Sequence, residues 1–138
     1  MLKKITGMLA CTILSMATYA NETDATPTCE FAGGDDIGVC FRNETGQDLN
    51  SQISMRVLAG QYSHETQFNV FPPEWYADSF ASLDQIKKLQ IPSISYVLTT
   101  NQKPIAGCSY TIDISQATKM SAPKILKIQK SEQLFCTE

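Results

Sequence analysis

His64 is the only histidine in the chain, and it is the one side chain suited to general acid or base chemistry near neutral pH. A nucleophilic site would place a serine or cysteine beside it. The polar stretch 61–66 that contains His64 is predicted to be an exposed hairpin loop, and the sequence has neither a G-x-S-x-G elbow nor an H-E-x-x-H helix. Carboxylates that cleave a glycoside are paired in space and not in sequence. A small secreted hydrolase that uses His64 or acidic residues is therefore one functional hypothesis, and we assign no catalytic residue.

Cysteine is the next residue type that can do chemistry. Of the five cysteines, Cys11 lies in the apolar N-terminal segment, and the other four are Cys29, Cys40, Cys108 and Cys136. An even number of cysteines in an exported chain predicts two disulfides. Four cysteines allow three pairings. We favour Cys29 with Cys40 and Cys108 with Cys136, because the members of each pair are close in sequence and the two bonds tie down both ends.

The same residues do not suggest a metal centre. Structural zinc sites use closely spaced cysteines, with or without histidines, whereas this chain has no C-x-x-C pair and His64 is distant in sequence from every cysteine. Asp35 and Asp36 follow two glycines, but the further acidic positions of a calcium loop are missing. We interpret both aspartates as turn residues. We expect neither a metal nor a cofactor.

Aromatic side chains gather in one short stretch, at Phe71, Trp75, Tyr76 and Phe80. Residues 72–74, two prolines and a glutamate, interrupt this stretch, which we predict to be a loop. Aromatic rings in a loop can stack on a sugar, insert into a lipid surface or anchor a protein partner, because each ring offers a large apolar area at a small entropic cost. The structural alternative is that the rings cover the open end of the domain. We take the four residues as the candidate binding surface.

The first 20 residues have the pattern of a cleavable signal peptide. Lys3 and Lys4 precede the uncharged, largely apolar stretch 5–16, and small residues follow as far as Ala20. We place cleavage after Ala20, with cleavage after Ala17 as the alternative. A run of about a dozen apolar residues is shorter than the roughly 20 that span a bilayer. The chain is therefore predicted to be secreted or periplasmic, in a bacterium because the charged region is so short, with no membrane anchor after cleavage.

A lipoprotein signal is a second interpretation of the same segment. Residues 9–11, Leu-Ala-Cys, resemble a lipobox, and processing there would leave Cys11 acylated at the new N-terminus. Only about five apolar residues precede that position, which is short for the apolar part of a signal peptide. We therefore retain cleavage after Ala20.

Cleavage after Ala20 removes 20 of the 138 residues and leaves 118, enough for one domain with a modest core. We predict a flexible polar leader at 21–28 and a single domain at 29–138. The full chain has 11 basic and 14 acidic residues, and loss of Lys3 and Lys4 changes its net charge from −3 to −5. A negatively charged domain is a poor partner for nucleic acid, so we expect none.

Alternating apolar and polar residues predict about seven short strands separated by turn residues. Ser82, followed by apolar residues at 83, 86 and 89, predicts a short capped helix that ends before Pro92. The clearest hairpin is predicted around a turn at 101–104. The predicted strands are 37–43, 53–59, 67–71, 94–100, 105–114, 124–129 and 134–136.

Short strands at this spacing indicate an all-β fold, namely a small antiparallel β-sandwich of immunoglobulin-like proportions with one short helix and two disulfides. A small open barrel is the alternative architecture. Trp75 lies between Cys40 and Cys108, but in a proline-led loop, so only the architecture is predicted. The functional hypothesis is a non-enzymatic exported binding protein for a protein or carbohydrate ligand. The secreted hydrolase and a membrane-active effector remain the alternatives.

Overall fold

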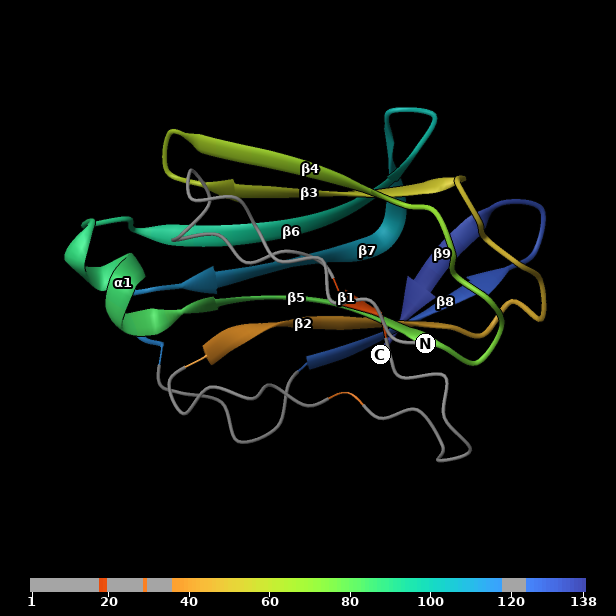
Figure 1. Ribbon diagram of the computed structural model, residues 1–138, viewed down its shortest axis with the longest axis horizontal. Coiled ribbons are helices and arrows are strands. Elements are labelled where there is room, and N and C mark those ends of the chain that lie inside the picture. The colour runs from red at the N-terminus through yellow and green to blue at the C-terminus, as the bar shows by residue number, and fades with distance from the viewer. Residues whose placement is uncertain (1–17, 20–28, 30–35, 118–123) are drawn as a thin grey trace.

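The computed structural model describes residues 18–19, 29, 36–117 and 124–138, and these residues are predominantly β-structure (Figure 1). The elements are β1 Thr18–Tyr19, β2 Asp36–Asn43, β3 Ile53–Ala59, β4 Tyr62–Phe68, β5 Tyr76–Ser82, α1 Leu83–Lys88, β6 Ser93–Thr100, β7 Lys103–Asp113, β8 Lys124–Lys130 and β9 Leu134–Thr137. The predicted mainly β class with one short helix is confirmed.

Strands with strong apolar alternation lie where the sequence predicts them, and these are β2, β3, β6, β7, β8 and β9. In β3, for example, Met55 and Val57 are buried, whereas Leu58 points to solvent. The predicted hairpin between β6 and β7 is also confirmed. Asn101 and Gln102 form its two-residue turn with positive φ values of 50° and 64°, as a type I′ turn requires.

β4 lies earlier in the chain than predicted. The sequence predicts a loop at 61–66 and a strand at 67–71, whereas the strand spans Tyr62–Phe68. A two-residue turn, with Gly60 at φ +62°, joins β3 directly to β4. β4 is an edge strand in which only Phe68 is buried, so its sequence is polar and lacks the apolar alternation of a core strand.

β5 is a strand that the sequence does not predict. The aromatic stretch is expected to be a loop as far as Phe80, but Tyr76–Ser82 pairs with β2 along its whole length. The buried side chains of β5 are small, namely Ala77, Ser79 and Ala81. Such small residues give no apolar signal, although they alternate regularly with half-buried residues.

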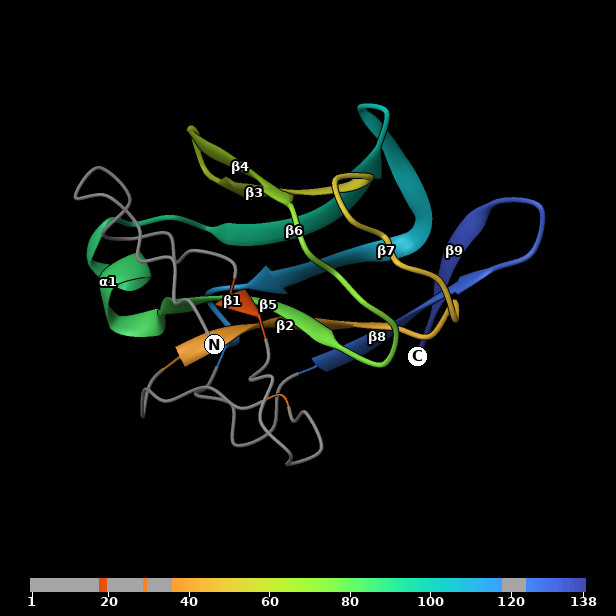
Figure 2. The same cartoon turned by 45° about the vertical axis from the view of Figure 1, so that its right-hand side comes forward.

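The strands form one sheet in the order β1-β5-β2-β8-β9-β7-β6-β3-β4. Strands β3, β4 and β6 lie in one layer and β2, β5 and β8 in the other, and β7 bends between them (Figures 1 and 2). The sheet is therefore barrel-like, with the two faces of the predicted sandwich joined through β7. Most neighbours are antiparallel, as predicted, but the pairs β2–β8 and β7–β9 are parallel. An alternating sequence pattern does not indicate whether neighbouring strands are parallel or antiparallel.

A close approach of β7 to β9 requires glycine at position 107. The φ of Gly107 is +75°, and a Cβ atom there would lie 2.5 Å from the carbonyl oxygen of Cys136. The next residue, Cys108, is disulfide-bonded to Cys136, with Cα atoms 4.9 Å apart. Gly107 thus lets the two strands meet where the disulfide joins them.

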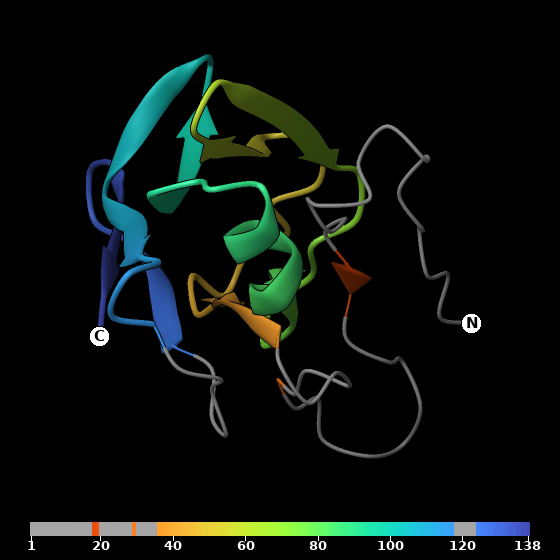
Figure 3. The same ribbon diagram turned by 90° about the vertical axis from the view of Figure 1, so that its left-hand side faces the viewer.

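The helix α1 lies across one end of the barrel-like sheet (Figure 3). Ser82 is its N-cap, and the Ser82 hydroxyl oxygen accepts a hydrogen bond from the amide of Gln85 at 3.4 Å. Leu83 and Ile86 are buried in the core. The predicted capped helix is confirmed, and its apolar side closes that end of the core.

The core fills the space between the two layers of the sheet. The hydroxyl of Tyr96, at the centre of β6, donates a hydrogen bond of 3.5 Å to the carbonyl oxygen of Ile37, so the polar end of this ring has a partner. The largest fully buried side chains are Tyr96, Phe41, Phe68, Phe71, Ile37, Leu49, Ile53, Met55, Ile86, Ile94, Leu98 and Ile128.

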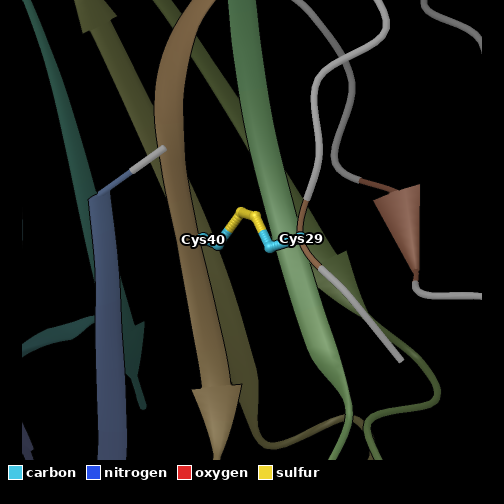
Figure 4. Close-up of a disulfide and its surroundings, with 2 residues drawn as sticks. All are labelled: Cys29 and Cys40. Carbon is cyan, nitrogen blue, oxygen red and sulfur yellow. A yellow bond between two sulfur atoms is a disulfide. The ribbon is translucent and has the colours of Figure 1, made fainter. Parts of the chain in front are cut away.

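Both predicted disulfides are present, Cys29–Cys40 and Cys108–Cys136. The Cα atoms of Cys29 and Cys40 are 6.3 Å apart, and the bond pins Cys29 to the outer face of β2 (Figure 4). On that face Cys40 has Asp78 of β5 as its cross-strand neighbour. The first disulfide therefore lies over the pair of strands β2 and β5.

The predicted signal peptide, 1–20, and the predicted leader, 21–28, lie outside the described residues except for Thr18 and Tyr19. These two residues form β1, which pairs antiparallel with β5. Thr18 is opposite Asp78, and Tyr19 is opposite Ala77. β1 and β4 are the two edges of the sheet.

Candidate functional site

The structure separates the four aromatic residues of the predicted binding surface. Phe71 is fully buried, and its ring meets the ring of Phe68 edge-on at a centroid distance of 5.5 Å. Trp75 is half-buried just before β5 and packs against the core. Tyr76 and Phe80 are half-buried on β5. The predicted loop therefore ends at Trp75, and Phe71 belongs to the core.

Phe80 lies apart from Tyr76, although both are on the same face of β5. They are four positions apart in the chain, which is about 13 Å along an extended strand. Phe80 is opposite Gly38 of β2, where the strands are so close that a Cβ on the glycine would collide with the backbone of β5. Of the four aromatic residues, Trp75 and Tyr76 remain together at the surface.

Tyr76 belongs to a group of side chains that we call the Arg42 cluster, formed by Arg42, Glu44, Glu74 and Tyr76. The Arg42 guanidinium lies over the Tyr76 ring, 5.5 Å from its centroid, and donates a hydrogen bond to Glu74 Oε2. Arg42 Nε lies 3.6 Å from Glu44 Oε2. Strand register sets up the cluster, because Arg42 of β2 and Tyr76 of β5 are directly opposite each other.

The Arg42 cluster holds a fixed positive charge between two carboxylates. Burial lowers the pKa of Arg42, but the hydrogen bond to Glu74 and the charges of its neighbours outweigh that effect, and the net pKa shift is upward. The two glutamates and the arginine together carry a net charge of −1. Arg42 Nε is buried and has no hydrogen-bond partner among the residues that the structure describes. Its ion-pair partner is Glu44 Oε2, at 3.6 Å.

Asn43 fastens this surface to the core. Its side chain is fully buried, and Nδ2 donates to the carbonyl oxygens of Gln47 at 2.8 Å and Phe71 at 2.9 Å. Its Oδ1 accepts hydrogen bonds from the amide and the hydroxyl of Thr45, at 3.0 and 2.6 Å. All the hydrogen-bonding capacity of the side-chain amide is used. The two loops that flank the Arg42 cluster are thereby joined through one residue.

The backbone of Asn43 holds the Glu74 and Trp75 segment directly. Its amide donates to the carbonyl oxygen of Trp75 at 2.9 Å, and its carbonyl oxygen accepts from the amide of Glu74 at 2.8 Å. Glu74 has a φ of 66°, which is a costly conformation for a side chain of this type. These contacts hold Glu74 where its carboxylate meets Arg42.

The cluster brings together polar and aromatic groups at the surface. It presents a stacked cation and aromatic ring and two carboxylates as acceptors, and the half-buried Trp75, which packs against the core, directly precedes Tyr76 in the chain. Such a combination can bind sugar hydroxyls or polar protein groups through hydrogen bonds while the rings supply apolar contact. The cluster holds no serine, cysteine or histidine, so hydrolytic chemistry there would have to use its two carboxylates.

His64 is on a strand and not in a loop, which corrects the prediction. It lies in β4 opposite Val57 and is half-buried. Its Nε2 is 3.1 Å from the hydroxyl oxygen of Thr66, two residues further along the same face. The four cysteines described by the structure are all in disulfides, so none offers His64 a thiol.

Asp36 also differs from its prediction as a turn residue. It is the first residue of β2 and is buried, with an exposed fraction of 8%. Asp35 lies outside the described residues. Within the described part of the chain there is no group of three or more histidine, cysteine or acidic side chains placed to hold a metal ion.

Arg42, Glu44 and Glu74 are parts of the site that the sequence does not predict. Arg42 and Glu74 are 32 residues apart, and nothing in their separate neighbourhoods links them. The available signal was the strand pattern of β2, which turns Arg42 to the same outer face as Cys40. Predicting its partner would have required β5 and its register with β2.

The described residues include no helix of sufficient length and apolar character to cross a membrane. No protein-family model matches the chain, and comparison with curated proteins and with solved structures found no significant match.

Proposed function

We propose that this chain is an exported, non-enzymatic binding protein that contacts a protein or carbohydrate ligand through the Arg42 cluster and the neighbouring Trp75. Export, to the periplasm or the outside of a bacterial cell, is supported by the N-terminal sequence pattern and is compatible with the two disulfides. The processed chain would carry a net charge of −5, which disfavours nucleic acid as its ligand.

The observation that carries this proposal is the way Arg42 is held. Ion pairs at a surface contribute about 0 to 1 kcal/mol to stability, so stability alone is a weak reason for two carboxylates and a ring around one guanidinium. Arginine, tyrosine and tryptophan are the residues that most often dominate binding energy at interfaces. Here Arg42 stacks on Tyr76, and the half-buried Trp75 directly precedes Tyr76 on a segment that Asn43 holds.

Photo-cross-linking in the exporting cell tests the protein-ligand half of the proposal. A benzoylphenylalanine at position 74, where the glutamate side chain is 62% exposed, should give an adduct with the ligand. The same probe at the exposed Glu132, in the turn between β8 and β9, should give none. Equal adducts at both positions, or an adduct at 132 alone, would contradict the proposed surface.

The single tryptophan of the chain, Trp75, gives a direct readout for carbohydrate ligands. Sugars that bind at the Arg42 cluster should change the intrinsic fluorescence of the purified protein in a saturable way. Arg42→Ala should abolish that change. Arg56→Ala is the matched control, because Arg56 is the other arginine of the chain and pairs with Glu65 at 3.4 Å on β3 and β4. Equal effects of the two variants would count against the cluster.

A further inference from the structure

The two edges of the sheet differ in what happens to them on export. β4 is one edge, and β1 is the other, paired with β5. If residues 1–20 are removed, β1 is removed with them, and β5 becomes the edge strand. We propose that this edge of β5 in the processed chain binds an extended segment of a partner protein as an added antiparallel strand, where Thr18 and Tyr19 lie in the unprocessed chain. The inference rests on the export in the proposed function and is independent of the Arg42 cluster.

The geometry of β5 suits strand addition. β1 shows directly that an extended segment fits against it in antiparallel orientation, with Thr18 opposite Asp78 and Tyr19 opposite Ala77. Edge strands are usually protected by prolines, lysines or short length. β5 has seven residues, no proline and no lysine, and Asp78 is its single charged residue. In this mode of recognition the backbone hydrogen bonds supply affinity, and alternate side chains supply specificity.

Loss of β1 leaves the rest of the fold in place. The buried core residues that the structure describes lie between Ile37 and Ile128. Both disulfides also remain, because Cys29 follows the proposed cleavage site. On its other side β5 keeps its full pairing with β2. The processed chain therefore retains β5 paired with β2, and among the residues that the structure describes no other strand pairs with the edge that β1 leaves.

Ser79 indicates what the added strand carries. Ser79 is only 1% exposed, and its Oγ has no hydrogen-bond partner among the described residues. Its neighbour on β2 is the apolar Val39. The residue opposite Ser79 on an added strand would point to the same face, with its Cβ about 5 Å away. A serine or threonine at that position would satisfy the Ser79 hydroxyl, so we infer that the partner segment has a hydroxyl residue there.

A synthetic peptide with the sequence of residues 14–21, Leu-Ser-Met-Ala-Thr-Tyr-Ala-Asn, is the probe. It is titrated into the exported protein, whose N-terminus is first read by intact mass, and amide chemical shifts and exchange rates are followed by NMR. Changes should centre on 76–82 of β5 and spare 62–68 of β4. A peptide with Thr18→Pro and Tyr19→Pro should bind at least about tenfold more weakly, because proline lacks the N–H that a ladder needs.

Ser79 is tested by a double-mutant cycle in the same titration. In a peptide that keeps the β1 register, Ala17 is opposite Ser79, so the Ala17→Ser peptide should bind more tightly than the natural one. That advantage, about threefold or more for one hydrogen bond, should disappear in the Ser79→Ala protein. Four equal affinities would overturn the proposed register.

Other outcomes overturn the proposal itself. Shifts confined to β4, or equal binding of the proline peptide, would show that the peptide does not add to β5. A processed protein that is already a dimer with slow exchange in β5 would show that a second copy is the occupant. An N-terminus at Met1 or Thr18 would leave β1 in place and would refute the open edge together with cleavage after Ala20. Failure of the Arg42 cluster alone is recognised separately, because Arg42→Ala should leave peptide binding unchanged.

Discussion

Asn43 shows how a single residue joins the core to the surface. Its amide group bonds the loop at 45–47 to the carbonyl oxygen of Phe71, and its backbone holds Glu74 and Trp75. A buried polar group of this kind is stabilising only while all its partners are satisfied. The position of the Arg42 cluster is therefore expected to depend on Asn43, which is outside the cluster.

Replacing Asn43 should destabilise the fold. Asn43→Ala removes four hydrogen bonds, two to the carbonyl oxygens of Gln47 and Phe71 and two from the amide and hydroxyl of Thr45, and should lower the free energy of unfolding by about 1 to 3 kcal/mol. Asn43→Asp should cost more at neutral pH, because it buries a carboxylate against the carbonyl oxygens of Gln47 and Phe71. Urea unfolding measures both, with the exposed Asn69→Ala as control. An Asn43→Ala variant as stable as the control would contradict this role.

Tyr96 should make the fold sensitive to alkaline pH. Burial raises the pKa of its phenol above the ordinary value of 10.0, and the nearby Asp36 carboxylate raises it further. The fold therefore favours the neutral phenol. The stability that the fold gains from holding this phenol neutral is complete below pH about 10, and it is lost as the pH rises from there toward the raised pKa.

Unfolding curves between about pH 8 and about pH 12 measure this effect, because that range brackets the ordinary pKa of tyrosine. The wild-type protein should lose stability at the upper end of that range. Ultraviolet absorbance of tyrosinate should report one phenol that ionises only when the protein unfolds, because burial disfavours the charged phenolate. Tyr96→Phe keeps the ring and should flatten the pH dependence. Tyr110→Phe, a half-buried tyrosine on β7, is the control. Equal slopes for Tyr96→Phe and the wild type would contradict the assignment.

At the scale of elements, the sequence is informative wherever a strand buries large side chains on one face. Alternating apolar residues correctly locate β2, β3, β6 and β7, and the serine cap locates α1. The same reasoning fails at β4, which is polar because it is an edge, and at β5, whose buried residues are alanine and serine. The error at β5 is also why the candidate site was only partly predicted, since Tyr76 meets Arg42 through the β2–β5 register.

A substitution at Gly107 tests whether the close approach of β7 to β9 requires glycine at this position. A Cβ at this position would contact the carbonyl oxygen of Cys136, and its positive φ is unfavourable for alanine. Gly107→Ala should therefore lower the free energy of unfolding by about 1 to 3 kcal/mol or more. Gly46→Ala is the matched control, because Gly46 has the same φ of +75° but an open environment. If the two variants lose the same stability, backbone conformation alone explains the effect and the close approach of β9 does not.

At the scale of the whole molecule, the two disulfides are compatible with a small domain outside the cytoplasm. One disulfide fixes Cys29 over β2 and the other joins β7 to β9, so the bonds act at two separate places in the sheet. Proximity in the sequence correctly predicts which cysteines form the two disulfides. The parallel strand pairs β2–β8 and β7–β9 are not predicted, because alternation of apolar residues does not encode strand direction.

Export is the claim on which both the binding proposal and the open edge of β5 depend. Intact mass spectrometry of the protein from the exporting host, with and without a thiol-alkylating reagent, tests it most directly. We predict an N-terminus at Asn21 and no alkylation, because removal of 1–20 takes away Cys11 and the other four cysteines are paired. A full-length chain that starts at Met1, or a processed chain with alkylated thiols, would contradict the account.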